Sequence, residues 1–150
     1  MASQYVVATG NIALVASTAK VVIEIPTGST KDFEVSSLEL SFSQFTPLGS
    51  CAVEWMTYAT TGTGTTVTAA KYGKNQGPAA ILGTVKINDT ALPGTLATAG
   101  LPSWLLPLPG MYSVTLPYAR EMYQPVSVLR CIQLTSTVAT NVRVTLVIEQ

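Results

Sequence analysis

The chain has 150 residues, which suits one domain with a sizeable core. Only 11% of the residues are charged, the eight basic and eight acidic residues cancel, and histidine is absent. This composition argues against a nucleic-acid partner, which requires a basic excess, and removes the commonest general base and metal ligand. A neutral, charge-poor surface instead favours association with other proteins.

Short apolar, β-branched runs near the N-terminus predict strands. The first two cover residues 12–16 and 20–25, and a turn at residues 26–28 follows them. In residues 31–45, apolar and polar side chains alternate, but the phase changes at Ser36–Ser37. Because a slip of one residue inverts the two faces of a strand, we expect a bulge or bend at this serine pair.

The next strand is expected after a break at Pro47, Gly49 and Ser50. It covers residues 52–60, with Trp55 in the core and Met56 on the opposite face.

The stretch from Thr60 to Ala70 reads TTGTGTTVTAA, with six threonines and two glycines. Threonine favours extended backbone and glycine favours turns, so the stretch predicts a loop or hairpin tip, with residues 67–72 returning along the preceding strand. It resembles a phosphate loop only superficially, because no Lys-Ser or Lys-Thr pair and no helix follow. It offers no group for acid–base chemistry.

Residues 73–83 are expected to form a loop, and residues 84–88 a short strand with Val85 and Ile87 turned inward. Residues 89–111 are rich in Ala, Pro, Gly, Thr and Leu without a clean period. They predict a long connection, which is unusual in a compact domain unless it has a function.

The C-terminal forty residues give the clearest pattern. Residues 111–116 alternate, and residues 125–136 and 141–149 predict two strong strands joined by a turn at 136–141. The best helix candidate, Tyr118 to Tyr123, spans little more than one turn. One apolar face of the last strand is formed by Val142, Val144, Leu146 and Ile148.

No apolar period of 3.6 residues persists, so the sequence predicts an all-β chain of about eight strands. We expect one domain over residues 1–150, a β-sandwich with jelly-roll-like topology. The N-terminus lacks the features of a signal peptide, and the apolar run 101–111 is short and broken by prolines. These features predict a soluble protein made in the cytoplasm, without a membrane partner.

Candidate catalytic and metal-binding groups are sparse. Glu34 and Glu39 are expected to be solvated charges on a strand face rather than a glycosidase pair. A serine nucleophile would need a base, and no Ser–Lys motif is present, so we predict no catalytic residue, no cofactor and no metal site. Cys51 and Cys131 are expected to be buried as small hydrophobes, with a disulfide between them left open. Asn88-Asp89-Thr90 matches a glycosylation motif, which we attribute to chance.

The segment LPSWLLPLPG contains the candidate contact residues. Trp104 lies in an expected loop, where it either closes one end of the sandwich or presents an apolar surface to a partner, since aromatic residues are enriched at interfaces. A sugar-binding role would also use an exposed tryptophan, but Asn, Asp and Arg are absent nearby. The candidate partner-contact residues are Trp104, Leu105, Leu106 and Leu108.

Three parts of the chain resemble a family of small tailed-bacteriophage virion proteins. The first part is GNIALVASTAKVVIEI followed by PTGSTKDFEVSSLELSF, and the second is GTGTTVTAAKY. The third is LPYAREMYQPVSVLRCIQLTS with NVRVTLVIEQ. Each motif is weak alone, and their order along the chain carries the resemblance. The segment ALPGTLATAGLPSWLLPLPG departs from the family by being unusually apolar.

The resemblance implies a head decoration (cement) protein on the capsid surface of a virion. Its partners would be the major capsid protein and further copies of itself, as a homotrimer or homodimer. Alternatives are another virion component, such as a tail, fibre-base or minor capsid protein, and a carbohydrate-binding module. An enzyme is the least favoured alternative, because reactive groups are scarce.

Overall fold

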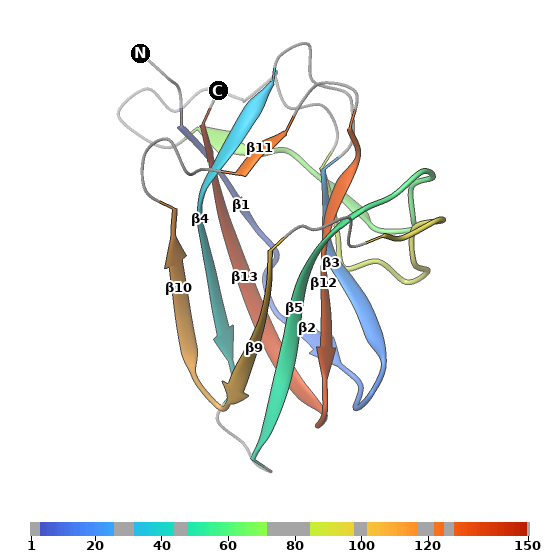
Figure 1. Cartoon of the computed structure of the whole chain (residues 1–150), viewed down its shortest axis with the longest axis vertical. Helices are drawn as coiled ribbons and strands as arrows, with labels where there is room; N and C mark the ends of the chain where they lie inside the picture. The colour runs from blue at the N-terminus through green and yellow to red at the C-terminus, as the bar shows by residue number, and fades with distance from the viewer. Residues whose placement is uncertain are drawn as a thin grey trace.

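The computed structural model describes residues 4–25, 32–43, 48–71, 85–97, 102–116, 122–124 and 128–149. These residues form strands and connections without a helix. Two antiparallel sheets pack face to face (Figure 1), which confirms the predicted all-β sandwich. None of the described segments is a helix that could cross a membrane.

The first sheet has seven strands, of which β10, β4, β13, β1 and β7 lie side by side in that order, while β11 pairs with β4 and β2 pairs with β13. These strands are β1 (Gln4–Ala8), β2 (Ile12–Leu14), β4 (Phe33–Phe42), β7 (Ala70–Lys71), β10 (Met111–Thr115), β11 (Met122–Gln124) and β13 (Thr140–Glu149).

The second sheet has six strands in the order β6-β8-β3-β12-β5-β9. These strands are β3 (Ala19–Ile25), β5 (Gly49–Thr57), β6 (Thr65–Val67), β8 (Val85–Ile87), β9 (Ser103–Leu108) and β12 (Arg130–Ser136).

Eight of the thirteen strands have five residues or more. In the first sheet the long strands follow the order β1-β13-β4-β10, and in the second the order β3-β12-β5-β9. In chain order, successive long strands alternate between the two sheets, except that β5 and β9 both belong to the second sheet. The jelly-roll-like topology expected from the sequence stays a prediction.

The main core lies between the sheets and is built from alternate residues of their strands. In β13 the predicted apolar face is fully buried, with Val142, Val144, Leu146 and Ile148 at 1% exposure or less. Trp55 of β5 is also buried there, as predicted. The period of two therefore determines which side of each long strand faces the core.

The predicted irregularity at Ser36–Ser37 is a β-bulge. Val147 pairs with Ser37 and the next residue, Ile148, pairs with Val35, so Ser36 is the extra residue of β4. Both Val35 and Leu38 are consequently buried, although they are three positions apart, an odd spacing that would otherwise place them on opposite faces. The bulge restores the inward phase after the break in the sequence pattern, which confirms the expected bulge.

Several local predictions were wrong. The proposed long connection over residues 89–111 contains β9, with Trp104 in a strand rather than a loop. Gly49 and Ser50 begin β5 instead of ending the previous strand. The end of the helix candidate, from Met122, belongs to β11. The predicted turn at 26–28 and loop at 73–83, like residues 118–121, lie outside the described residues.

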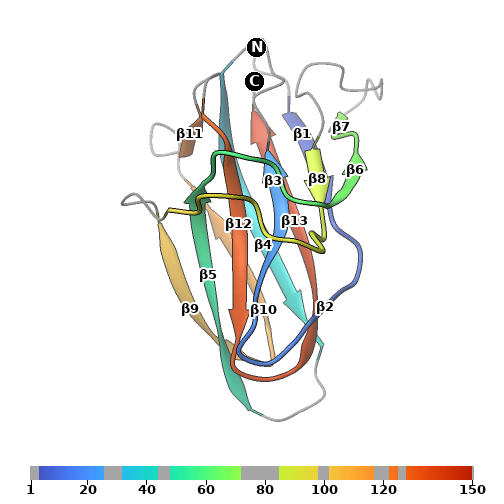
Figure 2. The same ribbon diagram turned by 90° about the vertical axis from the view of Figure 1, so that its right-hand side faces the viewer.

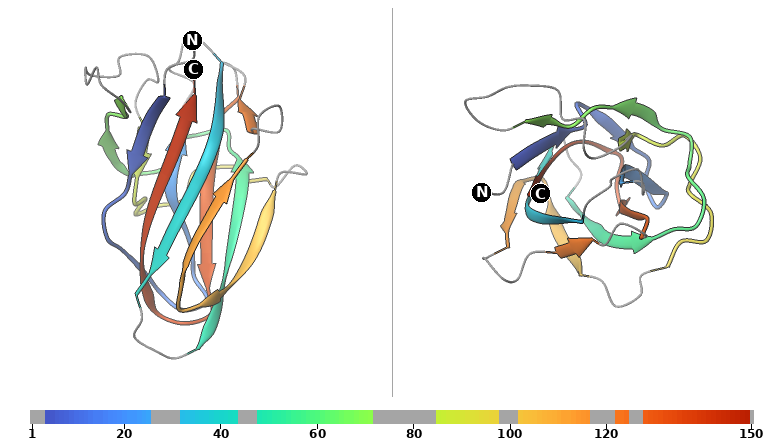
Figure 3. Two further views of the ribbon diagram at one scale, coloured as in Figure 1. Left: turned by 90° about the vertical axis from the view of Figure 1, so that its left-hand side faces the viewer. Right: turned by 90° about the horizontal axis from the view of Figure 1, so that it is seen from above.

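The Thr/Gly stretch also differs from its prediction. It does not return along β5: β6 pairs with β8 in the second sheet, and β7 pairs with β1 in the first. An additional strand, β1, was not predicted, and it pairs along its whole length with β13. The first and last described residues, Gln4 and Glu149, are therefore partners, and both ends of the chain lie at the same end of the sandwich (Figure 3).

A second, smaller core lies on the outer face of the second sheet. Two segments, residues 58–64 and 88–97, cross over this face (Figure 2), and we call them the cover. Backbone bridges join Thr57 to Ala97 and Thr60 to Gly94, which fastens one segment to the other. Beneath the cover, the apolar residues are Val21, Met56, Tyr58 and Cys131, flanked by Leu96 and Leu129.

Candidate protein interface

The open side of the sandwich is formed by β9 and β10, which we call the seam. β9 is the edge strand of the second sheet and β10 that of the first, and only Pro109 and Gly110 separate them in the chain (Figures 1 and 3). In the described residues, β9 pairs only with β5, and β10 only with β4. The seam thus exposes one edge of each sheet on the same side of the molecule.

The four predicted contact residues all lie in β9 but do not share one environment. Trp104, Leu106 and Leu108 point inward, and Leu108 belongs to the main core while the other two pack against it. Leu105 points outward and is 71% exposed. Because successive residues of a strand face opposite sides, three of the candidates stabilise the edge of the core and Leu105 alone offers a large exposed contact.

The backbone of β9 shows which groups are free for a partner. Trp55 N–H donates to Pro102 O at 3.2 Å, so residues 55 and 102 form a hydrogen-bonded pair of the antiparallel ladder. Such pairs alternate along the ladder. The backbone groups of Ser103, Leu105 and Pro107 therefore point away from β5, toward the open edge.

Pro107 limits this edge. It has no N–H, and its carbonyl already accepts a hydrogen bond from the hydroxyl of Tyr112. The edge available for pairing is consequently short and is centred on Ser103 and Leu105. Because proline lacks an N–H, prolines within sheets are confined mainly to edge strands. Pro107 therefore suits the position of β9 at the edge of the second sheet.

The seam carries no charge that would repel another sheet. Residues 90–119 contain no Lys, Arg, Asp or Glu. Exposed apolar side chains continue at the end of the seam, where Leu48 precedes Gly49, the partner of Leu108, and Met111 begins β10; both are 80% exposed. Natural edge strands are usually protected by charges, so an uncharged apolar edge indicates a surface that pairs with protein.

A second group of polar residues, which was not predicted from the sequence, lies beneath the cover. Glu24 of β3 is fully buried and Asp89, which follows β8, is 4% exposed. Gly62 N–H donates to Glu24 Oε1 at 2.6 Å, but Glu24 Oε2 and both carboxylate oxygens of Asp89 have no hydrogen-bond partner. The hydroxyl of Tyr58 is also buried without a partner. We call Glu24 and Asp89 the acid pair.

The two glycines of TGTGT make room for the acid pair. A Cβ at Gly62 would lie 2.5 Å from Asp89 Oδ2 and 2.7 Å from Glu24 Oε1, and a Cβ at Gly64 would lie 2.2 Å from Asp89 Oδ1. The two carboxyl groups therefore meet in front of Gly62, within about 5 Å of each other. The sequence holds one local signal of this arrangement, a single acid in the otherwise apolar run VVIEI.

The acid pair has no open cleft beside its carboxylate oxygens, because all the unpartnered ones are buried. No group of three or more His, Cys, Asp and Glu that could hold a metal ion occurs within the described ranges. Glu34 and Glu39, the acids considered from the sequence, are both exposed on β4, as expected. Among the described residues, the geometry thus brings two carboxyl groups together in a buried position.

The two cysteines are free and buried on opposite faces of the second sheet. Cys51 belongs to the main core and Cys131 to the second core, and Cys131 pairs with Met56, five residues along β5 from Cys51. Burial raises the pKa of Cys51 to about 11 and that of Cys131 to about 12. Both thiols therefore remain protonated and act as small apolar side chains.

Comparisons with known proteins found no match for this chain among family models, curated proteins or solved structures.

Proposed function

We propose that this protein is a viral structural protein, a capsid decoration (cement) protein of a tailed-phage head, which works through protein–protein contacts made by the seam. The observation that carries the proposal is the open edge of β9, where Leu105 is exposed and the strand contains no charged residue. The order of the sequence motifs supports the more specific role on a phage head.

The first occupant of the seam is a second copy of the chain. Ser103 and Leu105 each direct a backbone N–H and C=O to the open edge, and this short pattern is self-complementary when a second β9 lies antiparallel to it. Two neutral seams meet without charge repulsion, whereas a charged partner would find no complementary group there. Pairing of edge strands in this way is a common mode of recognition.

The larger assembly follows from repetition of this contact. An interface of this kind is small, and many copies on a symmetric shell together resist a load that one contact cannot. The major capsid protein would supply the surface on which the copies sit. A capsid surface location, after synthesis in the host cytoplasm, belongs to the same proposal, and a tail, fibre-base or minor capsid position is its alternative.

Self-association is tested with Leu105→Lys, which places a charge at the centre of the open edge. We expect the wild-type protein to form a dimer at about 100 µM and the variant to be monomeric, by size-exclusion chromatography with light scattering. Val15→Lys is the matched control, because Val15 is similarly exposed, at 64%, but lies outside the seam. Self-association through the seam would be contradicted by a monomeric wild-type protein, or by an equal loss of self-association in Leu105→Lys and Val15→Lys.

The location is tested separately by electron microscopy and protein analysis of purified particles, with and without the protein. We expect it on heads. Recovery on tails alone would support the alternative virion component and reject decoration, while leaving the self-association result intact.

A carbohydrate-binding module is a weaker candidate on this geometry. Trp104 is half-buried and packs against the main core, so its ring does not stand free as a stacking platform for a sugar. Titration of the tryptophan fluorescence with glycans tests this alternative: a saturable quench that Trp104→Phe removes would replace the structural role with sugar binding.

A further inference from the structure

The acid pair poses a problem of charge. Two carboxylates removed from water within about 5 Å of each other repel strongly, and burial of each ionised group is costly. The described residues form no ion pair with Glu24 or Asp89. The amine of Lys86 lies nearby but donates to Gly62 O at 2.9 Å, so it offsets part of the charge at a distance without satisfying a carboxylate oxygen.

A single proton resolves most of this problem. A carboxyl group that keeps its proton is neutral and becomes a donor, and a second carboxylate beside it is an acceptor. With one proton on the pair, the remaining negative charge is balanced by Lys86. The proton therefore removes the like-charge repulsion and supplies one of the missing hydrogen bonds.

The acid pair also links the cover to the sheet. Glu24 belongs to β3 and receives the backbone N–H of Gly62, from one segment of the cover, while Asp89 belongs to the other segment. Near the pair, the backbone N–H of Thr90 donates to Thr63 O at 2.8 Å, and the hydroxyls of Thr63 and Thr90 are 2.8 Å apart. Repulsion within the pair would therefore act directly on the contacts that hold the cover closed.

We propose that Glu24 and Asp89 share one proton, and that this proton keeps the cover closed over the second sheet, so that its loss releases residues 58–64 and 88–97. The observation that carries the proposal is the convergence of two buried, mostly unpartnered carboxyl groups in front of Gly62. It does not depend on the seam or on the particle.

The direction of the effect follows from the neighbouring groups. Burial, and then the hydrogen bond that a proton allows between the two carboxyl groups and the charge of Glu24, raise the pKa of Asp89 from 3.8 to about 8, against smaller opposing effects of Lys86 and Lys20. The folded state therefore binds more protons than the unfolded state between these two values. The stabilisation is complete below about pH 4, declines as the pH rises and is lost at about pH 8.

Two further titratable groups face the pair and do not change charge in this range. Burial, and then the charge of Glu24, raise the pKa of Tyr58 far above neutrality, and Cys131 also stays protonated. The charged side chains that act on Asp89, besides Glu24, are Lys86 and Lys20. Asp89 is thus the group beneath the cover whose pKa shift gives the pH dependence.

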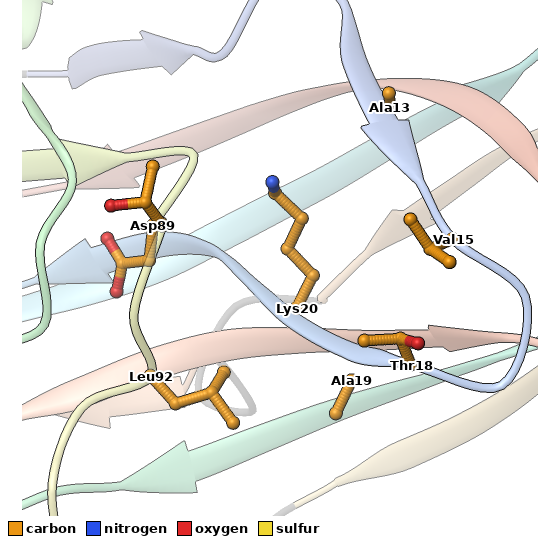
Figure 4. A pocket seen from close by; sticks show the side chains of 8 residues that line it. Ala13, Val15, Thr18, Ala19, Lys20, Asp89 and Leu92 are labelled. Carbon is orange, nitrogen blue, oxygen red and sulfur yellow. The ribbon is translucent and has the colours of Figure 1, made fainter.

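A surface pocket of about 150 Å³ lies beside Asp89 (Figure 4). It is lined by residues that include Lys20, Asp89, Thr90 and Leu92. The carboxyl group of Asp89 points away from the Lys20 amine, toward the interior, as its burial requires (Figure 4). Base in solution therefore has a short path to Asp89 once the cover loosens.

Hydrogen exchange of the wild-type protein over about pH 5 to pH 9, corrected for the intrinsic rate, tests the proposal directly. We expect protection of residues 58–64 and 88–97 to fall by up to about tenfold per pH unit until about pH 8, while β13 keeps its protection. The melting temperature should fall by about 5 °C or more over the same range. Protection of the cover that is independent of pH would overturn the proposal.

The variants Asp89→Asn and Glu24→Gln keep the shape of each side chain and remove the repulsion. We expect both to lose the pH dependence of the cover and to exceed the wild-type melting temperature near pH 9. Glu39→Gln, on the exposed face of β4, is the control and should retain the wild-type profile. A wild-type profile in both acid-pair variants would contradict the proposal, and if neither folds, the wild-type exchange series alone decides.

A titration with Ca²⁺ tests whether the acid pair binds a metal ion instead of sharing a proton. If millimolar Ca²⁺ raised the wild-type melting temperature near pH 8, and a chelator and Asp89→Asn each removed that gain, the pair would be a cation site and the shared proton would be rejected. We expect Ca²⁺ to leave the melting temperature and the exchange of the cover unchanged.

Discussion

The two faces of the second sheet bury their residues in different ways. Its inner face joins the first sheet in a mainly apolar core, where Trp55, Ile132 and Leu134 are at 1% exposure or less. Its outer face is closed by two irregular segments, and the space beneath them holds Met56, Cys131 and the acid pair.

This difference implies that the stability of the main core and that of the cover depend on pH to different extents. The main core depends on area removed from water, a contribution that changes little with pH. The cover depends on a few contacts around two carboxyl groups, which respond to protons. Regions with few apolar contacts open at low cost, so we expect the cover to open before the sandwich unfolds.

Trp55→Ala should have the largest effect, because it removes the largest fully buried side chain from the main core. We expect a loss of about 3–5 kcal/mol in the free energy of unfolding, measured by urea denaturation. Protection from hydrogen exchange should fall in both sheets. A loss confined to the cover would show that the main core does not unfold as one unit.

Gly62→Ala should have the next largest effect, through a collision rather than a cavity. The new Cβ would lie 2.4 Å from Ala91 O as well as close to both carboxyl groups, so the cover must shift. We expect a loss of about 2–3 kcal/mol. Gly10→Ala is the control: Gly10 has φ +67° and open space around it, so only backbone strain of about 1 kcal/mol is expected. Equal losses of unfolding free energy in Gly62→Ala and Gly10→Ala would contradict a steric collision at Gly62.

Met56→Ala compares the second core with the first at the neighbouring position of β5. Met56 faces the cover and is 8% exposed. We expect a loss of about 2 kcal/mol, smaller than that of Trp55→Ala, because the thin cover can collapse into the space. Hydrogen exchange should rise mainly in residues 58–64 and 88–97. An effect as large as that of Trp55→Ala would remove the distinction between the two cores.

Tyr58→Phe should have the smallest effect and the opposite sign. The variant removes a buried hydroxyl that has no hydrogen-bond partner while keeping the ring beneath the cover. We expect a gain of up to about 1 kcal/mol at pH 5, where the acid pair holds its proton. Thermal unfolding measures this gain. A clear loss of stability would show that the hydroxyl bonds the acid pair.

The parts of the fold that could be predicted from the sequence are those where the period of two is clean. β13 buries every second residue, and the interrupted pattern around Ser36 was sufficient to locate the bulge of β4. β9 was missed because Trp104, Leu105 and Leu106 are apolar on both faces and prolines flank them, a pattern that resembles a loop. Only the position of β9 at the edge of a sheet makes these prolines acceptable.

The candidate site could be predicted only in part. The segment around Trp104 was identified, but which of its residues faces solvent depends on the strand phase, and this leaves Leu105 as the outward contact. The acid pair could not be predicted, because Glu24 and Asp89 are 65 positions apart and meet only through the antiparallel pairing of β3 and β8. The glycines that admit them look like turn residues until their neighbours are known.

The pairing of Gln4 with Glu149 has a practical consequence for engineering. Their side chains are joined by a hydrogen bond of 2.7 Å, so a short peptide could connect these two positions without disturbing either sheet. A circular permutant opened elsewhere on the surface should therefore fold. Peptides fused at both positions would also emerge together from one end of the sandwich, so one molecule would display two different peptides side by side.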